Sequence, residues 1–260
     1  MLGCVGKVLK ILTVISENSN KPISLKRIAE ISGIPKSTCA RILTELMEEG
    51  YVEQISRTEG YRLGPAVYYL SRYGRYNSEF IEVCHPVLRW LHNKTGLCVG
   101  LARIQNDKVF IVDCLNTNPI TVTQRGGVYP EDIYFTPAGR ILMANMSVSE
   151  LVRIYEKYGN PVTGIKGDWH EVTSFETLKE ALAQIDPKGV LKFIERHGEE
   201  TQVRWGGWGT AIYKSGKCVG AVVISVTTAN GTMEAALAKE EEIKRYMLKA
   251  RNEIGRRLTY

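Results

Sequence analysis

Three polar side chains in one short segment have the types and spacing to hydrogen-bond with DNA. Ser37, Thr38 and Arg41 lie at the start of a stretch with helical periodicity, residues 36–50. The planar guanidinium of Arg41 can donate to guanine O6 and N7 together, or to a phosphate. The two hydroxyl groups can reach phosphates or base edges. This chemistry requires a helix that presents the three side chains to the major groove.

An apolar stripe indicates which side of this helix is buried. Cys39, Ile42, Leu43 and Leu46 recur at i, i+3, i+4 and i+7, the spacing of a core-facing side. At about 100° per residue, Ser37 and Arg41 point away from the stripe and Thr38 flanks them. Acidic residues that would repel phosphate gather at the other end: Glu45, Glu48 and Glu49. We therefore predict a recognition helix whose N-terminal half contacts DNA.

A shorter helix and a tight turn precede the recognition helix. Residues 24–32 predict a helix with Ser24 as its N-cap and an apolar side formed by Leu25, Ile28, Ala29 and Ile31. Gly33 supplies the backbone freedom that the turn needs, and Pro35 is expected to begin the next helix. Gly50 is expected to end it as a C′ residue. Together these features predict a helix-turn-helix.

A β-hairpin is predicted directly after the recognition helix. Residues 51–55 and 61–63 have the composition of its strands, and the turn at 57–60 carries Arg57. The helix pair alone could be any short helical hairpin, but a wing that follows it makes DNA binding a much more specific interpretation. The candidate DNA-contacting residues are Lys26, Lys36, Ser37, Thr38, Arg41 and Arg57.

These motifs resemble the N-terminal domain of IclR-type bacterial transcriptional regulators. The similar features are the turn GIPKST, the Arg-x-Leu pattern at Arg41 to Leu43 and the Tyr-x-Leu-Gly pattern at Tyr61 to Gly64. The resemblance implies that Ser37, Thr38 and Arg41 face DNA. It also implies that the partner is double-stranded DNA with a near-palindromic operator, bound by a homodimer or a dimer of dimers.

Composition is consistent with this interpretation but does not require it. The 260 residues suffice for two modest domains, and 44% hydrophobic with 24% charged residues is ordinary for a globular protein. A net charge of +6 suits a nucleic-acid partner. The six cysteines form no Cys-x-x-Cys pair, which favours reduced thiols and a cytoplasmic protein. No secretory segment or membrane-spanning stretch is expected.

We predict three parts along the chain. Residues 1–64 form the winged helix-turn-helix, residues 65–77 a helical linker and residues 78–260 the second domain. The first helix, at 5–17, is expected to pack through Val5, Val8, Leu9, Leu12 and Ile15 or Ser16. The linker is rich in tyrosine, with Tyr68, Tyr69, Tyr73 and Tyr76. These side chains could form a dimer surface or be half covered by a neighbouring domain.

The second domain alternates between strand and helix patterns. We expect strands at 97–104, 108–115 and 119–124, helices at 136–146, 149–158 and 174–184, a hairpin at 201–214 and 217–227, and a final helix at 233–258. Ser147 with Glu150 predicts a capping box, and Ser174 a further cap. The fold class is therefore α+β with a mainly antiparallel sheet. Several segments, GAVVISVTT among them, resemble the GAF-like effector-binding domain of the same family.

A helix start in this domain could bind an acid. Thr136, Pro137, Ala138 and Gly139 open a helix with small residues, so backbone N–H groups could approach a carboxylate, although Pro137 itself has none to donate. The family resemblance implies a small organic or aromatic acid as effector. It places Ala138 and Gly139 near the acid group, Ser225 and Thr227 on the last strand, and Glu199 or Glu200 near the mouth of the pocket.

Three aromatic residues leave two alternatives open. Tyr134, Trp205 and Trp208 could form an aromatic wall of the effector pocket, or they could belong to the core. Two tryptophans among three glycines in VRWGGWGT depart from the acidic or alcohol-rich stretch common at this place in the family.

No catalytic residue, metal site or cofactor is expected. The four histidines form no metal-ligand or nucleophile motif, and residues 206–209 lack the Lys-Ser/Thr partner of a phosphate-binding loop. Our hypothesis is a DNA-binding repressor or activator whose operator affinity depends on a small effector. The alternatives are a winged-helix protein with an enzymatic second domain, and a protein interaction module without specific DNA binding.

Overall fold

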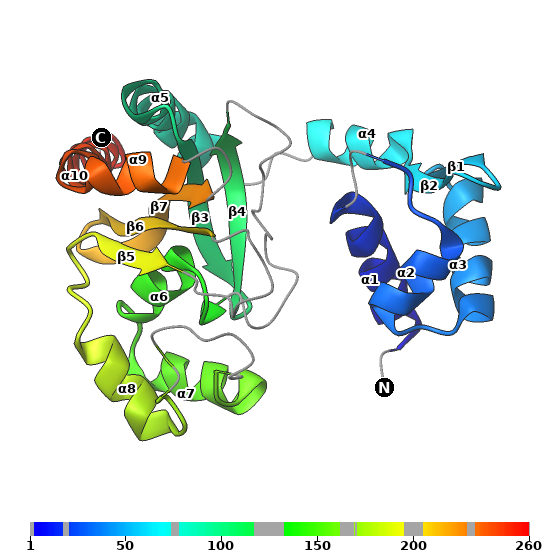
Figure 1. Ribbon diagram of the computed structural model, residues 1–260, viewed down its shortest axis with the longest axis horizontal. Coiled ribbons are helices and arrows are strands. Elements are labelled where there is room, and N and C mark those ends of the chain that lie inside the picture. Colours follow the sequence, from blue (N-terminus) through cyan, green and yellow to red (C-terminus); the bar gives the residue numbers. More distant parts are fainter. Residues whose placement is uncertain are drawn as a thin grey trace. The chain divides into compact units, whose positions relative to one another are not determined.

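The computed structural model describes residues 3–17, 21–73, 78–116, 133–161, 169, 171–194, 205–227 and 232–259. Contacts divide the chain into two units, Met1–Asn77 and Ser78–Tyr260. Residues 65–77 cluster with the first unit. The helices and strands of both units are labelled in Figure 1.

The first unit packs short helices against a two-stranded wing (Figure 1). Its elements are α1 (Cys4–Glu17), α2 (Leu25–Ser32), α3 (Lys36–Glu48), β1 (Val52–Ser56), β2 (Gly60–Leu63) and α4 (Pro65–Tyr73). Ile11, Ile28 and Leu43 are fully buried at its centre. The predicted helix-turn-helix with a following wing is confirmed.

The packed side of α1 differs from the prediction. Ile11, Val14 and Ile15 are its buried residues, whereas Val5 and Leu9 are 72% and 58% exposed. The apolar residues of α1 occupy more than one side of the helix, and the core covers only the side that its C-terminal half presents. The expectation that Val5 and Leu9 face the core is therefore wrong.

The turn between α2 and α3 is closed by caps and side-chain bonds. The Ser24 hydroxyl caps α2 by accepting a hydrogen bond from the Arg27 N–H, and Gly33 ends the helix in the left-handed region at φ 65°. The buried Ser32 hydroxyl accepts from the Ile34 N–H at 3.3 Å. These bonds fix the angle at which α3 leaves the turn.

Pro35 lies one position earlier in the recognition helix than expected. It is the N-cap of α3, with φ −52° and ψ 137°, and the helix begins at Lys36. Its carbonyl accepts the first helical bond from the Cys39 N–H at 2.9 Å. The extended ψ of Pro35 keeps it outside the helix although its φ suits one. Gly50 follows the C-cap Glu49 at φ 73°, as predicted.

The wing is anchored to the helices through Ile23. The N–H of Ile23 donates to the Tyr61 carbonyl at 2.8 Å, and the Tyr61 N–H donates to the Ile23 carbonyl at 2.9 Å. The neighbouring Gly60 has φ 103°, and a Cβ there would overlap the Ile23 carbonyl. Only glycine fits where the two chains approach this closely.

The second unit is built on an antiparallel sheet of order β4-β3-β7-β6-β5 within the described residues. The strands are β3 (Cys98–Gln105), β4 (Lys108–Leu115), β5 (Leu191–Ile194), β6 (Trp205–Lys214) and β7 (Lys217–Thr227). The α+β class and both hairpins are confirmed. The short strand β5 was not predicted, and the strand expected at 119–124 lies outside the described residues.

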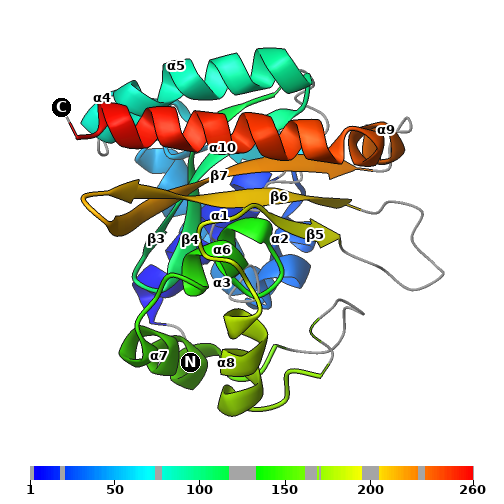
Figure 2. The same cartoon turned by 90° about the vertical axis from the view of Figure 1, so that its left-hand side faces the viewer.

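Helices cover both faces of this sheet, as Figure 2 shows. One face carries α5 (Ser78–Thr95) and α10 (Glu240–Arg257); the other carries α6 (Pro137–Met143). Helices α7 (Val148–Tyr158) and α8 (Phe175–Ala183) begin with the predicted caps Ser147 and Ser174, each within a capping box. Two separate buried clusters result, one on each face.

The final helix consists of two pieces rather than one. Helix α9 (Thr232–Ala238) ends at Lys239, whose φ of −111° and ψ of 19° leave the helical region, and α10 starts at Glu240. Glu240, Glu241 and Glu242 then occupy the first turn of α10, where the helix dipole favours negative charge. This run of acidic residues is the sequence feature that marks the second start.

Candidate nucleic-acid interface and ligand site

Helix α3 presents a polar face opposite its buried stripe. Ser37 and Arg41 are exposed and Thr38 is half-buried, while the side that carries Cys39, Ile42, Leu43 and Leu46 is buried. Thr44, also exposed, lies on the same face because it follows Arg41 by three positions and Ser37 by seven. Thr44 was not among the predicted residues, although the same spacing rule could have identified it.

Basic side chains at the start of α3 and at the wing are available to a ligand. Within the described part of the chain, Lys36, Arg41 and Arg57 form no ion pair. Lys26 lies on α2, where it is 81% exposed and 3.9 Å from Glu30. Such an exposed pair contributes little energy and yields readily to a phosphate. The first unit therefore offers guanidinium, ammonium and hydroxyl donors on its α2, α3 and wing segments.

The tip of the wing is held by one serine. The Ser56 hydroxyl accepts a hydrogen bond from the Glu59 N–H at 2.9 Å and bonds with the Thr58 hydroxyl at 3.1 Å. Arg57, between them in sequence, is exposed. The turn thus fixes the backbone while Arg57 stays accessible, as a phosphate contact would require.

In the first turn of α6, the Gly139 N–H is hydrogen-bonded within the protein and the small residues are packed against its backbone. The Thr136 hydroxyl accepts from the Gly139 N–H at 2.9 Å, and a Cβ at Gly139 would overlap the Ile133 backbone. Ala138 is 3% exposed. The small residues that suggested an open anion site therefore serve close packing, and Gly139 does not present its amide to a ligand in this conformation.

The glycines of β6 have a packing role too. A Cβ at Gly209 would lie 2.8 Å from the Pro137 carbonyl oxygen, so α6 rests directly on the strand. A Cβ at Gly207 would overlap the Ile224 carbonyl of the neighbouring strand. This close approach accounts for the unusual glycine content of residues 206–209.

Tyr134 belongs to the core on the α6 side of the sheet. It is 1% exposed, and its hydroxyl donates to the Gly159 carbonyl at 2.9 Å. Its own carbonyl accepts from Arg140 Nε at 2.8 Å. The Arg140 guanidinium lies 4.1 Å from the Trp169 ring centroid and 4.6 Å from that of Phe193. A buried positive charge is thus held among aromatic rings beside α6.

Trp208 lies in the cluster on the opposite face. It is 1% exposed and packs with residues of α5 and α10 such as Leu88 and Met247, whereas Tyr134 packs in the α6-side cluster. The sheet separates the two rings, so they do not form one wall. Both side chains are buried in the core, Tyr134 on the α6 side of the sheet and Trp208 on the side of α5 and α10.

Two of the remaining predicted ligand residues, Ser225 and Thr227, lie near one end of the sheet. Strand pairing places Ser225 opposite Gly207 on one side and Cys98 on the other, and pairs Thr227 with Trp205. Ser225 is half-buried. The side chains of Trp205 and Thr227, and the whole of Glu199 and Glu200, lie outside the described residues.

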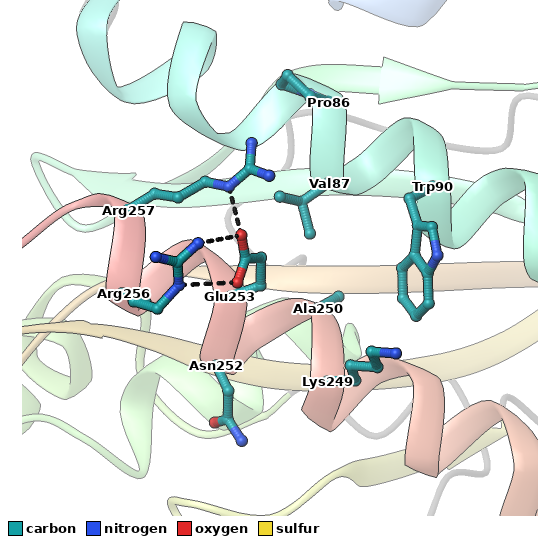
Figure 3. A pocket seen from close by; sticks show the side chains of 9 residues that line it. All are labelled: Pro86, Val87, Trp90, Lys249, Ala250, Asn252, Glu253, Arg256 and Arg257. Atoms are coloured by element: carbon teal, nitrogen blue, oxygen red, sulfur yellow. Dashed lines mark hydrogen bonds and ion pairs between the residues drawn. The ribbon is translucent and has the colours of Figure 1, made fainter.

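A groove on the other face, between α5 and α10, contains none of the predicted residues (Figure 3). It has a volume of about 690 Å³ and is lined by Pro86, Val87, Trp90, Lys249, Ala250, Asn252, Glu253, Arg256 and Arg257. Its acidic group is already paired, since Glu253 accepts from Arg256 at 2.8 Å and from Arg257 at 2.7 Å. These two bonds hold the pKa of Glu253 well below its ordinary value, at about 2.

The described residues contain neither a candidate metal site nor a candidate membrane-spanning helix. They contain no group of three or more histidine, cysteine or acidic side chains that could hold a metal ion. Of their helices, none is long and apolar enough to cross a membrane.

Two protein-family models match the sequence. The IclR helix-turn-helix domain matches residues 5–56, and the C-terminal domain of bacterial transcriptional regulator IclR matches residues 76–254. Among curated proteins, the transcriptional repressor IclR of Escherichia coli is 26% identical over 73% of this chain and 68% of its own length. The HTH-type transcriptional regulator TtgV of Pseudomonas putida is 32% identical over 47% and 46%.

Solved structures have the same fold. An IclR homologue of Microbacterium hydrocarbonoxydans, in complex with 4-hydroxybenzoate, gives a TM-score of 0.62 at 18% identity and covers 96% of this chain and 98% of its own. The IclR transcriptional regulator of Alicyclobacillus acidocaldarius gives 0.64 at 18% identity and covers 99% of both chains.

Proposed function

The chain belongs to the IclR family of DNA-binding transcriptional regulators, and from this premise we propose a function for each of its two units. The first unit binds a specific operator in double-stranded DNA. The second binds a small effector and changes operator affinity. The match of the second unit to the C-terminal domain of a transcriptional regulator argues against an enzymatic second domain. The match of the first unit to the IclR helix-turn-helix domain argues against an interaction module without DNA binding.

Arg41 is the observation on which the DNA-binding assignment depends. It is exposed on the polar face of α3, opposite the buried stripe, and the described residues offer it no ion-pair partner. Its guanidinium reads a guanine edge, with Ser37 and Thr38 contacting bases or phosphates beside it. Lys26, Lys36 and Arg57 contact phosphates, which sets the register but not the sequence preference.

Two copies of the first unit bind successive major-groove faces of a near-palindromic operator, as a homodimer or a dimer of dimers. Apolar side chains on the surface of the first unit support self-association: Val5 and Leu9 on α1, and Tyr68, Tyr69 and Leu70 on α4, are each more than half exposed. Contiguous exposed apolar surface marks interaction sites, and Tyr68, Tyr69 and Leu70 are consecutive in α4. The protein acts in the cytoplasm.

The effector is a small organic acid, with aromatic acids the first class to test because one family structure holds 4-hydroxybenzoate. It binds on the α6 face of the sheet, at the end where Ser225 and Thr227 lie. Ala138 and Gly139 shape this face through the close packing of α6 rather than by donating their amides. Trp205 and Glu200 are further proposed contacts, and Tyr134 supports the site from the core. Trp208 is left out because it faces the other side. Binding shifts operator affinity by about 1–3 kcal/mol.

The test is anisotropy of labelled DNA from upstream of the protein's own gene, compared with a random duplex over a series of salt concentrations. Preferential binding that Arg41→Ala abolishes supports the assignment. Arg245→Ala is the matched control, because Arg245 is 72% exposed on α10 of the second unit. Equal affinity for both duplexes, lost at moderate salt, would reflect electrostatic attraction alone. If genome-wide selection then also returned no operator, the proposed function would be wrong.

A further inference from the structure

Two cysteines from neighbouring strands of the second unit bring their sulfur atoms together. Cys98 begins β3 and Cys114 lies next to the end of β4, and their Sγ atoms are 3.8 Å apart. Cross-strand pairing joins Gly100 to Cys114. Because alternate residues of a strand share a face, Cys98 and Cys114 are diagonal neighbours on one face of the sheet.

The pair consists of a solvent-exposed thiol and a second thiol beside it. Cys114 is exposed and Cys98 half-buried. Cys39 and Cys84 are buried, and burial together with the charge of Asp113 raises the pKa of Cys84 to about 12. Cys218 donates to the Gly220 carbonyl at 3.6 Å, and burial raises the pKa of its thiol. Cys98 and Cys114 are therefore the thiols best placed to react with one another.

The hydrogen bond between the two sulfurs favours one of them as the nucleophile. When the Cys98 thiol donates to Cys114, it stabilises the Cys114 thiolate and lowers the pKa of that group. Burial and the charge of Asp113 act in the opposite direction. The same bond, together with burial, raises the pKa of Cys98. With this donor, the reactive thiolate form is favoured on the exposed partner, Cys114.

Asp113 is restrained by other partners. One carboxylate oxygen lies 2.8 Å from His85 Nδ1 on α5, and the other accepts from the Cys114 N–H at 2.9 Å. Arg89 lies 2.9 Å from the far nitrogen of the same imidazole. These contacts link the Cys114 backbone to α5.

We propose that Cys98 and Cys114 form a redox-active dithiol that peroxides oxidise to a disulfide. The Cys114 thiolate attacks one peroxide oxygen, the O–O bond breaks, and hydroxide leaves and takes a proton from solvent. The Cys114 sulfenic acid then reacts with the Cys98 thiol, which forms the S–S bond and releases water. The two sulfurs lose two electrons to hydrogen peroxide, which becomes two molecules of water. A cellular dithiol reverses the reaction by exchange.

Formation of the disulfide requires only a local movement. A disulfide places its sulfurs about 2.0 Å apart, compared with 3.8 Å between the thiols here. Within the described sheet, β4 is an edge strand that pairs with β3 alone, and Cys114 is near its end. The end of an edge strand can shift with little loss of pairing, so the Cys114 sulfur can approach Cys98 through a movement confined to the end of β4.

The regulatory consequence rests on the proposed function. Cys98 pairs directly with Ser225 of β7, and Ser225 is a proposed effector contact. A disulfide that fixes β4 to β3 beside this position changes the shape of the effector face. Oxidation is therefore expected to weaken effector binding by about tenfold, while the operator-binding residues of the first unit remain unmodified.

The chemistry is tested on the reduced full-length chain, treated with hydrogen peroxide, alkylated, and analysed by peptide mass spectrometry. We expect a disulfide between Cys98 and Cys114, none in Cys114→Ser, and a sulfenic acid at Cys114 that dimedone captures in Cys98→Ser. Cys218→Ser is the matched control and still forms the disulfide. Circular dichroism checks that each variant is folded. Oxidation at Cys4 or Cys218 with no link between Cys98 and Cys114 would overturn the proposal.

Operator and effector binding are measured separately on the reduced and oxidised chains. If the reduced chain binds no operator, the proposed function is wrong. The disulfide is tested independently, because peptide mass spectrometry detects it whether or not the chain binds DNA. A disulfide that leaves effector affinity unchanged refutes only the regulatory consequence.

Discussion

Gly209 of β6 faces the carbonyl of Pro137 in α6 so closely that a Cβ would lie 2.8 Å from the oxygen. The obstacle is backbone on both sides, so neither partner can rotate away as a side chain would. The contact sets the distance between the helix and the sheet on the face where the effector is proposed to bind. Gly209 is therefore a position where a single methyl group tests how that face is assembled.

Gly209→Ala is expected to destabilise the second unit by about 1–3 kcal/mol, because the added methyl forces α6 away from β6. Urea unfolding measures the change. Gly3→Ala is the matched control, since a Cβ at Gly3 meets nothing within 4 Å. Equal stability of the two variants would show that α6 is not held against the strand in solution.

Arg41→Ala is expected to weaken binding to the specific operator by about 1–3 kcal/mol, because a bidentate contact to guanine is lost. Arg41→Lys retains the charge but not the planar fork. It should therefore keep the salt dependence of binding while losing most of the preference for the operator over random DNA. Anisotropy titrations at several salt concentrations separate the two effects. Unchanged preference in Arg41→Lys would assign Arg41 to a phosphate contact.

The local features of the fold could be read from the sequence. Ser24, Ser147 and Ser174 cap their helices as predicted, since a cap depends on residues within one turn. Gly33 takes the left-handed conformation that a tight turn needs. The buried stripe of α3 follows from spacing alone. For the same reason the position of Arg41 on the polar face could be predicted.

Features that depend on distant partners could not be read in this way. In WGGWGT each side of strand β6 carries one tryptophan and at least one glycine, so the sequence could not show which face of the sheet Trp208 lies on. It therefore could not show that Trp208 and Tyr134 lie on opposite faces. The exposure of Val5 and Leu9 depends on where the neighbouring elements end, not on the periodicity of α1. The sequence alone offered no reason for the glycines at 207 and 209, because the close approach of Ile224 and Pro137 comes from segments distant in the chain.

Ser24→Ala is expected to lower the stability of the first unit by about 1 kcal/mol, because the Arg27 N–H loses its capping acceptor. Ser16→Ala is the control. Ser16 is exposed within α1, and its hydroxyl only donates back to the Thr13 carbonyl, so alanine there should be neutral or slightly stabilising. Thermal unfolding of both variants provides the comparison. A larger loss in Ser16→Ala would contradict the cap assignment.

Ser225→Ala is expected to weaken binding of an aromatic acid by about fivefold to tenfold, through loss of one hydrogen bond to the ligand. A panel of small acids that begins with 4-hydroxybenzoate is screened first by thermal shift, and the best ligand is then titrated calorimetrically. Ser149→Ala, at an exposed position in α7, is the control. Identical affinity in both variants would place the effector away from the β7 end of the sheet.

Glu150 gives a prediction about pH. The Ser147 side chain and backbone N–H both donate to its carboxylate, at 2.7 and 2.8 Å, and these bonds lower its pKa from the ordinary value of 4.5. A carboxyl whose pKa is lower in the folded state stabilises the fold fully above its unfolded-state pKa. That contribution is lost as pH falls through the folded-state pKa. Glu150→Gln should therefore destabilise the second unit at pH 6, and this effect should shrink as pH falls from 6 to below 4.5. Urea unfolding over this pH range measures the difference, with Glu176→Gln as the control because Glu176 is 72% exposed and bonds only to Lys179. If Glu150→Gln lowers the free energy of unfolding as much at acidic pH as at pH 6, the substitution acts through lost packing and not through the ionised capping box.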